Sequence, residues 1–143
     1  MTIKQLSVFA ENKSGSLAKI TDALEKAHID IRALSIADTT NFGILRLIVD
    51  DPDKAYDAMK EADFTATLTD VIGIGVPDEP GGLAKALRVL EDASVSVEYI
   101  YAFLGVHDRT AYVIIRVDDN DGAEKVLESA GIRLLRPEEL YNM

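Results

Sequence analysis

Residues 78–83 read Asp-Glu-Pro-Gly-Gly-Leu, and they join an apolar strand-like run at 72–76 to a run with helical spacing of apolar residues. A related turn, Asn-Lys-Ser-Gly-Ser-Leu at 12–17, follows the apolar run at 6–10. Gly15 and Gly81 permit a tight turn or the close approach of a ligand to the backbone. The helix start that follows presents unpaired N–H groups at the positive end of the helix dipole, where carboxylates and phosphates bind. A single such turn is an ordinary helix start, but its repetition favours a binding role.

The two turns belong to an internal repeat. Gly15 corresponds to Gly81 at an offset of 66 residues, and Val49 corresponds to Val117 at an offset of 68. The second half therefore carries two extra residues between about 102 and 111, where a hairpin loop tolerates insertion. Self-similarity over this length indicates two copies of one supersecondary unit.

Each copy alternates strand and helix patterns in the order β-α-β-β-α-β. In the first copy, we expect strands at 3–10, 31–38, 43–50 and 64–71, with helices at 15–28 and after 51. In the second copy, we expect helices at 82–93 and 120–130, the latter ended by Gly131, and a final helical turn near the C-terminus. The fold class is α+β: two ferredoxin-like units, residues 1–71 and 72–143, each an antiparallel sheet with helices on one face.

The apolar residues of the first helix of each copy should face inward. These residues are Leu17, Ile20, Leu24 and Ala27 in the first copy and Leu83, Leu87 and Leu90 in the second. On the strand that starts at 97, alternation places Val97, Tyr99, Tyr101 and Phe103 on the opposite, open face, together with Gly73 and Gly75. An uncovered aromatic face needs a partner, either the other unit or another chain, and we expect that it pairs with a second copy in a homodimer.

Composition excludes several classes of function. The chain has no cysteine, and its net charge is −10 from 15 basic and 25 acidic residues. Both halves are acidic, which argues against binding of nucleic acid or an anionic membrane surface. With no signal-peptide pattern and no segment of membrane-spanning length, we expect a cytoplasmic protein.

Other chemical signals are weaker. The Gly73-Ile74-Gly75 stretch lacks the third glycine of a dinucleotide loop, because Asp78 stands there. The acids at 50–53 and 118–121 are explained as helix N-terminal charges, so no metal site is expected. No nucleophile and base stand in a recognisable arrangement, and no cofactor is implied. We therefore expect a protein without catalytic activity.

The two βαββαβ units, each with a polar-Pro/Ser-Gly-x-Leu turn after the first strand, resemble tandem ACT domains over nearly the whole chain. Residues 78–83 match the family pattern closely, whereas the first turn has Ser14 where proline is usual. The resemblance implies a sensor of free amino acids that is associated with a metabolic enzyme. It also implies that the ligand lies where two ACT units meet, between the turn of one unit and the second-strand start of its neighbour.

Matched to this chain, the resemblance implies a site in each turn and at each strand start. The turn residues are Asn12, Lys13, Ser14, Gly15, Ser16 and Leu17, and Asp78, Glu79, Pro80, Gly81, Gly82 and Leu83. The strand-start residues are Asp30 and Ser96, where many amino-acid-binding members carry asparagine. Backbone N–H groups of the turns should take the α-carboxylate, and Asn12, Asp78, Asp30 and Ser96 are candidates for the α-ammonium.

Three functions remain open at this point. The first is a sensor of free amino acids, with a lean toward histidine or an aromatic amino acid because of the acidic surroundings and nearby tyrosines. The second is an interaction subunit of a metabolic enzyme, with vestigial sites and a functional aromatic face. The third is an acyl phosphate hydrolase, which ferredoxin-like folds also host; the absence of arginine from 10–17 and 76–83 argues against it.

Overall fold

The computed structural model describes residues 2–11, 13–38, 42–104 and 108–143. Two compact units are present. The N-terminal unit is Lys4–Thr69 with Tyr141–Met143, and the C-terminal unit is Asp70–Leu140 with the start of the chain through Ile3. The division into domains at residues 71 and 72 stays a prediction.

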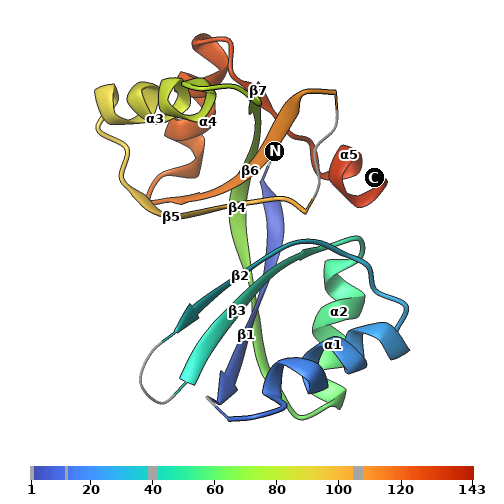
Figure 1. The fold of residues 1–143 in the computed structure, drawn as a ribbon. Coiled ribbons are helices and arrows are strands. Elements are labelled where there is room, and N and C mark those ends of the chain that lie inside the picture. Colours follow the sequence, from blue (N-terminus) through green and yellow to red (C-terminus); the bar gives the residue numbers. More distant parts are fainter. Residues whose placement is uncertain (1, 12, 39–41, 105–107) are drawn as a thin grey trace. The chain divides into compact units, whose positions relative to one another are not determined.

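The N-terminal unit has the predicted order of elements (Figure 1). Its strands lie in the order β2-β3-β1-β4, and β3 pairs antiparallel with both β1 and β2. The two helices lie on one face of this sheet (Figure 1). The elements are β1 (Ile3–Glu11), α1 (Ser16–Lys26), β2 (Ile31–Asp38), β3 (Phe42–Val49), α2 (Pro52–Glu61) and the start of β4 (Thr65–Pro77).

The C-terminal unit repeats this arrangement. The second half of β4 pairs antiparallel with β6 and with β7, and β5 pairs antiparallel with β6. The elements are α3 (Gly82–Asp92), β5 (Val97–Ala102), β6 (Thr110–Val117), α4 (Asn120–Ser129), β7 (Arg133–Leu134) and α5 (Pro137–Tyr141). The helices follow the two offsets read from the sequence, since α1 and α3 differ by 66 residues and α2 and α4 by 68. The α+β fold of paired ferredoxin-like units is thus confirmed.

β4 serves both units. The sequence predicts one strand at 64–71 and another at 72–76, but the structure joins them into a single strand of 13 residues. Its burial changes along its length: the first half alternates, whereas Val71–Val76 are all buried. The chain therefore passes from one unit to the next within one strand.

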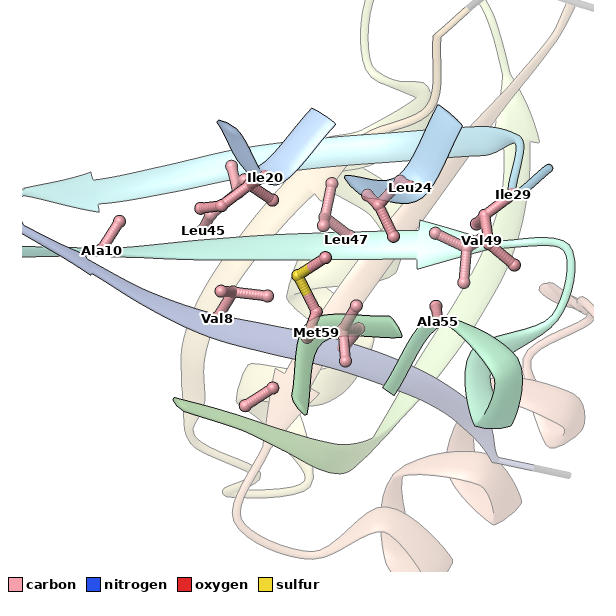
Figure 2. Packing of buried hydrophobic residues seen from close by; sticks show 12 residues of the cluster. Val8, Ala10, Ile20, Leu24, Ile29, Leu45, Leu47, Val49, Ala55 and Met59 are labelled. Carbon is pink, nitrogen blue, oxygen red and sulfur yellow. The ribbon is translucent and has the colours of Figure 1, made fainter. Parts of the chain in front are cut away.

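The core of each unit lies between the sheet and its two helices. Figure 2 shows Ile20 and Leu24 of α1 and Met59 of α2 over Leu45 and Leu47 of β3. The matching cluster of the C-terminal unit contains the inner positions of α3 and α4. Its buried members are Ile72, Ile74, Val76, Ala86, Leu90, Val113, Ile115, Val117, Ala123, Leu127 and Ile132.

The prediction that Leu17 and Leu83 face inward is wrong. Leu17 is 47% exposed and Leu83 is 38% exposed, whereas the residues before them, Ser16 and Gly82, are buried. Both leucines occupy the second position of their helices, immediately after the glycine turn. The buried stripe of each helix runs through its first residue instead, with Ser16, Ile20 and Leu24 in α1 and Gly82, Ala86 and Leu90 in α3.

The face assigned to Val97 is also wrong. The pairing of β5 with β6 shifts between Val97 and Tyr99, so Val97 pairs with the core residue Val117 while Tyr99 pairs with Arg116. The equivalent shift occurs in β2 between Ile31 and Ala33. A β-bulge adds one residue to one strand and exchanges the two faces beyond it.

The remainder of the aromatic face is as predicted, but it is not bare. Tyr101 pairs with Ile114, which pairs with Gly73, so these residues share the open face. Tyr99 stacks on Tyr101 with 6.4 Å between ring centroids. Ile3 and Leu135 lie over Gly73, where an added β-carbon would approach the Ile3 Cδ1 atom to 2.6 Å. The chain itself thus supplies part of the cover for this face.

An ion-pair cluster holds the C-terminal segment against this unit. The Arg133 guanidinium lies over the Tyr112 ring at 5.7 Å and binds the Glu139 carboxylate at 3.1 Å. Glu139 also accepts a hydrogen bond from the backbone N–H of Arg136 (3.0 Å), and this bond, followed by the Arg133 contact, holds the pKa of Glu139 below its usual value.

The core assignment predicts a contrast between two leucines of α1. Leu24→Ala should lower the free energy of unfolding by about 2–5 kcal/mol, because it empties a fully buried site. Leu17→Ala should change it by no more than about 0.5 kcal/mol, because that side chain is half-exposed. Urea denaturation followed by circular dichroism measures both. Equal losses for the two variants would contradict the assignment.

The Glu139 contacts predict a small pH-dependent contribution to stability. Because the folded-state pKa is lowered, the contribution is present above the unfolded pKa of about 4.3 and is lost as the pH falls through the folded value. Glu139→Gln should lower the free energy of unfolding by about 0.2–1 kcal/mol at pH 7, a small range because solvent screens this partly exposed group. The difference from the unmodified protein should vanish in acid. Glu138→Gln, at an exposed neighbour, is the matched control. A Glu139→Gln cost that stays constant from pH 7 to pH 3 would show that the carboxylate charge is not the cause.

Candidate functional site

Both predicted turns have the same backbone geometry. Gly15, with φ 86°, precedes the first residue of α1, and Gly81, with φ 89°, precedes the first residue of α3. Both are in the left-handed region, which glycine adopts without the steric cost that a β-carbon brings. Apart from the adjacent residues in the chain, no heavy atom of the described residues lies within 4 Å of where a β-carbon would stand at either glycine, so both positions are open.

The helix starts behind these glycines differ from the other two long helices. Asp51 and Asp119 cap α2 and α4, accepting hydrogen bonds from the N–H groups of Lys54 (3.1 Å) and Gly122 (3.0 Å). No side chain of the described residues caps α1 or α3. The N–H groups of Ser16 and Gly82 donate to the carbonyls of Lys13 (3.3 Å) and Glu79 (3.1 Å). The N–H groups that follow in the first turns of α1 and α3 have no side-chain acceptor among the described residues, and they can bind an anion at the positive end of each helix dipole.

A hollow of about 310 Å³ lies at the first turn. The end of β1, the turn, and the neighbouring parts of β2 and β3 line it. The lining residues are Ala10, Glu11, Lys13, Ser14, Ser16, Leu17, Ile36 and Gly43. Within it the Lys13 ammonium and the Glu11 carboxylate form an ion pair at 3.2 Å. The structure thus brings four of the predicted first-turn residues into one concave surface; Asn12 lies outside the described residues.

The second turn is more acidic and more tightly closed. The N–H of Asp78 donates to the carbonyl of Arg109 (2.8 Å), which ties the turn to the β5–β6 connection. Gly82 has no space for a side chain, because a β-carbon there would overlap the Pro77 carbonyl oxygen. The equivalent residue in the first turn, Ser16, carries a side chain. The two turns share the left-handed glycine conformation. They differ in the space available at the first helical residue and in the charge of their side chains.

The strand-start residues form a second repeated arrangement. Asp30 N–H donates to the Asp50 carboxylate (3.0 Å), and Ser96 N–H donates to the Asp118 carboxylate (3.1 Å). Asp30 also pairs with Arg32. The acids that follow β3 and β6 thus hold the starts of β2 and β5, which is a structural role that their sequence pattern did not reveal.

Within one unit, the turn and the strand start lie at opposite ends of the sheet. The end of β1 pairs with Phe42, whereas the start of β2 pairs with Val49 at the other end of β3. That length of strand is on the order of 20 Å. A ligand cannot contact Ser14 and Asp30 of the same unit together, so a site that uses both needs a turn and a strand start from different units. That composite site stays a prediction.

Sequence reasoning missed four residues of the hollow: Ala10, Glu11, Ile36 and Gly43. Ile36 lies on the helix-side face, as its pairing with Leu45 shows, yet it is 48% exposed because β2 is an edge strand. Glu11 could have been predicted from the sequence, because an acidic residue directly before a lysine-containing turn can form an ion pair with that lysine. The position of Ile36 depends on strand pairing and has no local signature.

Comparison with known families agrees with this geometry. The family model for an ACT domain pair matches residues 1–143. The chain belongs to the ACT domain pair family. The resemblance seen in the sequence is therefore confirmed, and each unit is an ACT domain. No curated protein matches the chain at a significant level.

Solved structures with the same architecture include one clear relative. The protein BT0572 from Bacteroides thetaiotaomicron is 45% identical, with a TM-score of 0.93, and the match covers 100% of this chain and 98% of that one. The ligand-free regulatory subunit of aspartate kinase from Thermus thermophilus is 18% identical, with a TM-score of 0.65, and the match covers 89% of this ACT pair and 91% of that chain. The subunit from Thermus flavus is 17% identical, with a TM-score of 0.58 and coverage of 90% and 92%. The last two likenesses show a shared fold.

The two turns predict opposite responses to the same substitution. Gly82→Ala should lower the free energy of unfolding by about 1–3 kcal/mol, because the new methyl group meets the backbone of Pro77. At the equivalent site, the β-carbon of residue 16 should not be destabilising. The free energy of unfolding of Ser16→Ala should therefore be higher than that of Ser16→Gly. Thermal and urea melts of all three variants provide the measurement. A Gly82→Ala protein as stable as the unmodified chain would show that the second turn is looser than described.

Proposed function

We propose that this protein is a regulatory ACT domain pair that binds a free amino acid at its glycine turns and communicates the binding to a partner. One observation carries the proposal: α1 and α3 start behind left-handed glycines without a side-chain cap among the described residues, whereas α2 and α4 of the same chain are capped by aspartate. These two helix starts thus have first-turn N–H groups without a side-chain acceptor among the described residues, and a ligand can bind them.

In the proposed site, the α-carboxylate of the ligand accepts hydrogen bonds from backbone N–H groups near Gly15 or Gly81, at the positive ends of the helix dipoles. The α-ammonium binds an acceptor from the neighbouring unit or from the turn. The candidates are Asn12, Asp78, Asp30 and Ser96, and the two aspartates give charge-assisted bonds. With two or three such contacts, each contributing about 1.5–3 kcal/mol, we expect affinities from about micromolar to millimolar.

The proposal assigns no catalytic role to the chain. The regulatory subunits of aspartate kinase share this fold, and their name places them beside an enzyme. By analogy, we propose that this ACT pair acts in the cytoplasm as a homodimer and modulates a metabolic enzyme. No helix among the described residues has the length and apolar character needed to cross a membrane.

A second candidate function is that of an interaction subunit without a ligand. It is favoured by the stacked pair of Tyr99 and Tyr101 on the sheet face away from the helices. In that case, the turns have only a structural role, and the aromatic face binds the partner. An acyl phosphate hydrolase is disfavoured because neither turn contains an arginine.

A thermal-shift screen of the twenty amino acids tests the proposal, since a ligand that binds only the folded state raises the melting temperature. We expect at least one amino acid to raise it and the corresponding α-amide to have no effect, because amidation removes the carboxylate. Asp78→Ala should weaken binding at the second turn, and Asn12→Ala should leave about half of the bound ligand in calorimetry. If none of the twenty shifts the transition, the sensor function is wrong and the interaction subunit replaces it.

A further inference from the structure

We propose that the hollow at the first turn selects an amino acid with a branched aliphatic side chain, such as leucine, isoleucine or valine. This inference rests on the proposed function, because it names the ligand class of one of its sites. It concerns the N-terminal unit alone, and all eight residues that line the hollow belong to that unit.

The charged part of the lining suits a zwitterion. The Lys13 and Glu11 side chains are 61% and 75% exposed, and their charged groups lie 3.2 Å apart. An exposed pair of this kind contributes little to stability, so exchanging partners costs little. A free amino acid offers one charge of each sign: its carboxylate replaces Glu11 beside Lys13, and its ammonium replaces Lys13 beside Glu11.

The apolar part of the lining suits an aliphatic side chain. Leu17 and Ile36 are 47% and 48% exposed, although both are large and apolar, and the buried Ala10 lies with them. Covering such surfaces is favourable by roughly 25 cal/mol for each Å² removed from water. Gly43 borders the same hollow, and a β-carbon there would be 3.5 Å from the Ile36 side chain. Glycine therefore keeps this edge of the hollow free for a ligand.

The same lining disfavours a polar side chain. Among the described residues, the polar side chains that line the hollow are the charged pair and the hydroxyl groups of Ser14 and Ser16, and the α-groups of the ligand engage them. An imidazole, hydroxyl or amide placed against Leu17 and Ile36 would lose its hydrogen bonds to water without replacement. Histidine, to which the acidity of the chain pointed, does not suit this hollow.

The second turn lacks both features, so it provides an internal comparison. At the offset of 66 residues, Lys13 becomes Glu79 and Ile36 becomes Ala102, so the cation and one large apolar wall are missing. Leu17 has a direct counterpart in Leu83, which is 38% exposed at the same position of α3. The two leucines are therefore a matched pair: they are alike in helix position and exposure, and only the first lines the hollow described above.

Calorimetry on the full-length protein tests the selection. L-Leucine should bind more tightly than L-serine, L-asparagine and L-histidine at the first turn, and Leu17→Gln should weaken leucine binding about tenfold, the usual effect of altering an apolar contact in a pocket. Leu83→Gln, at the other turn, should change the leucine affinity of the first turn by no more than about twofold. Ile36→Thr, which keeps the β-branch but removes the δ-methyl group and introduces a hydroxyl, should weaken leucine binding like Leu17→Gln, and circular dichroism confirms that each variant is folded.

The outcomes separate this inference from the proposed function. If amino acids bind, but leucine affinity is equally insensitive to Leu17→Gln and Ile36→Thr, the aliphatic selection is wrong while the sensor function stands. Tighter binding of histidine than of leucine, lost in Leu17→Gln but not in Leu83→Gln, would overturn the selection in the same way. If no amino acid binds the unmodified protein, the proposed function fails, and this inference fails with it.

Discussion

Each unit of this protein depends on the burial of one sheet face beneath two helices. Ile20, Leu24 and Met59 cover the first sheet, and Ala86, Leu90 and Leu127 cover the second. About 70 residues give a small core, so each helix must lie close to its strand. That closeness requires a sharp reversal at the end of the first strand of each unit. The reversal is made by Gly15 and Gly81 in the left-handed conformation.

The candidate site is a consequence of that reversal. A glycine at the helix start turns the chain tightly, but it supplies no side chain to accept hydrogen bonds from the first helical turn. At α2 and α4, aspartates occupy the cap position, and each accepts a hydrogen bond from the first helical turn. The packing constraint and the binding chemistry therefore have the same origin: the turns that let α1 and α3 reach the core are the turns that stay open to an anion.

Duplication preserved the scaffold and let the surfaces diverge. The buried positions correspond across the two units, as Leu24 and Leu90 do, because each must fill an equivalent space. The turns keep the glycine and the leucine, but their polar residues differ, and Lys13 and Glu79 even carry charges of opposite sign. A site with two dissimilar copies can respond to two ligands or to one ligand at two concentrations, which a pair of identical units cannot do.

The sequence by itself determined the architecture of this protein. The two offsets, the helix and strand periods, the glycines of the turns and the stop at Gly131 all predicted elements that the structure contains, because each depends on residues close together in the chain. Gly131 shows this directly: its left-handed φ of 78° ends α4 where the sequence placed the end.

Only the tertiary structure decided which side chains are buried in the core, which are exposed and which line the hollow. Leu17 and Leu83 follow the helical period but are exposed, since burial depends on whether a sheet lies opposite. Val97 was assigned to the wrong face because a single bulged residue reverses the alternation of a strand, and strand pairing leaves no mark in the local sequence. The lining of the first-turn hollow joins residues from β1, β2, β3 and the turn for the same reason. Local physics sets the elements, and the contacts among distant elements set the surface at which a ligand would bind.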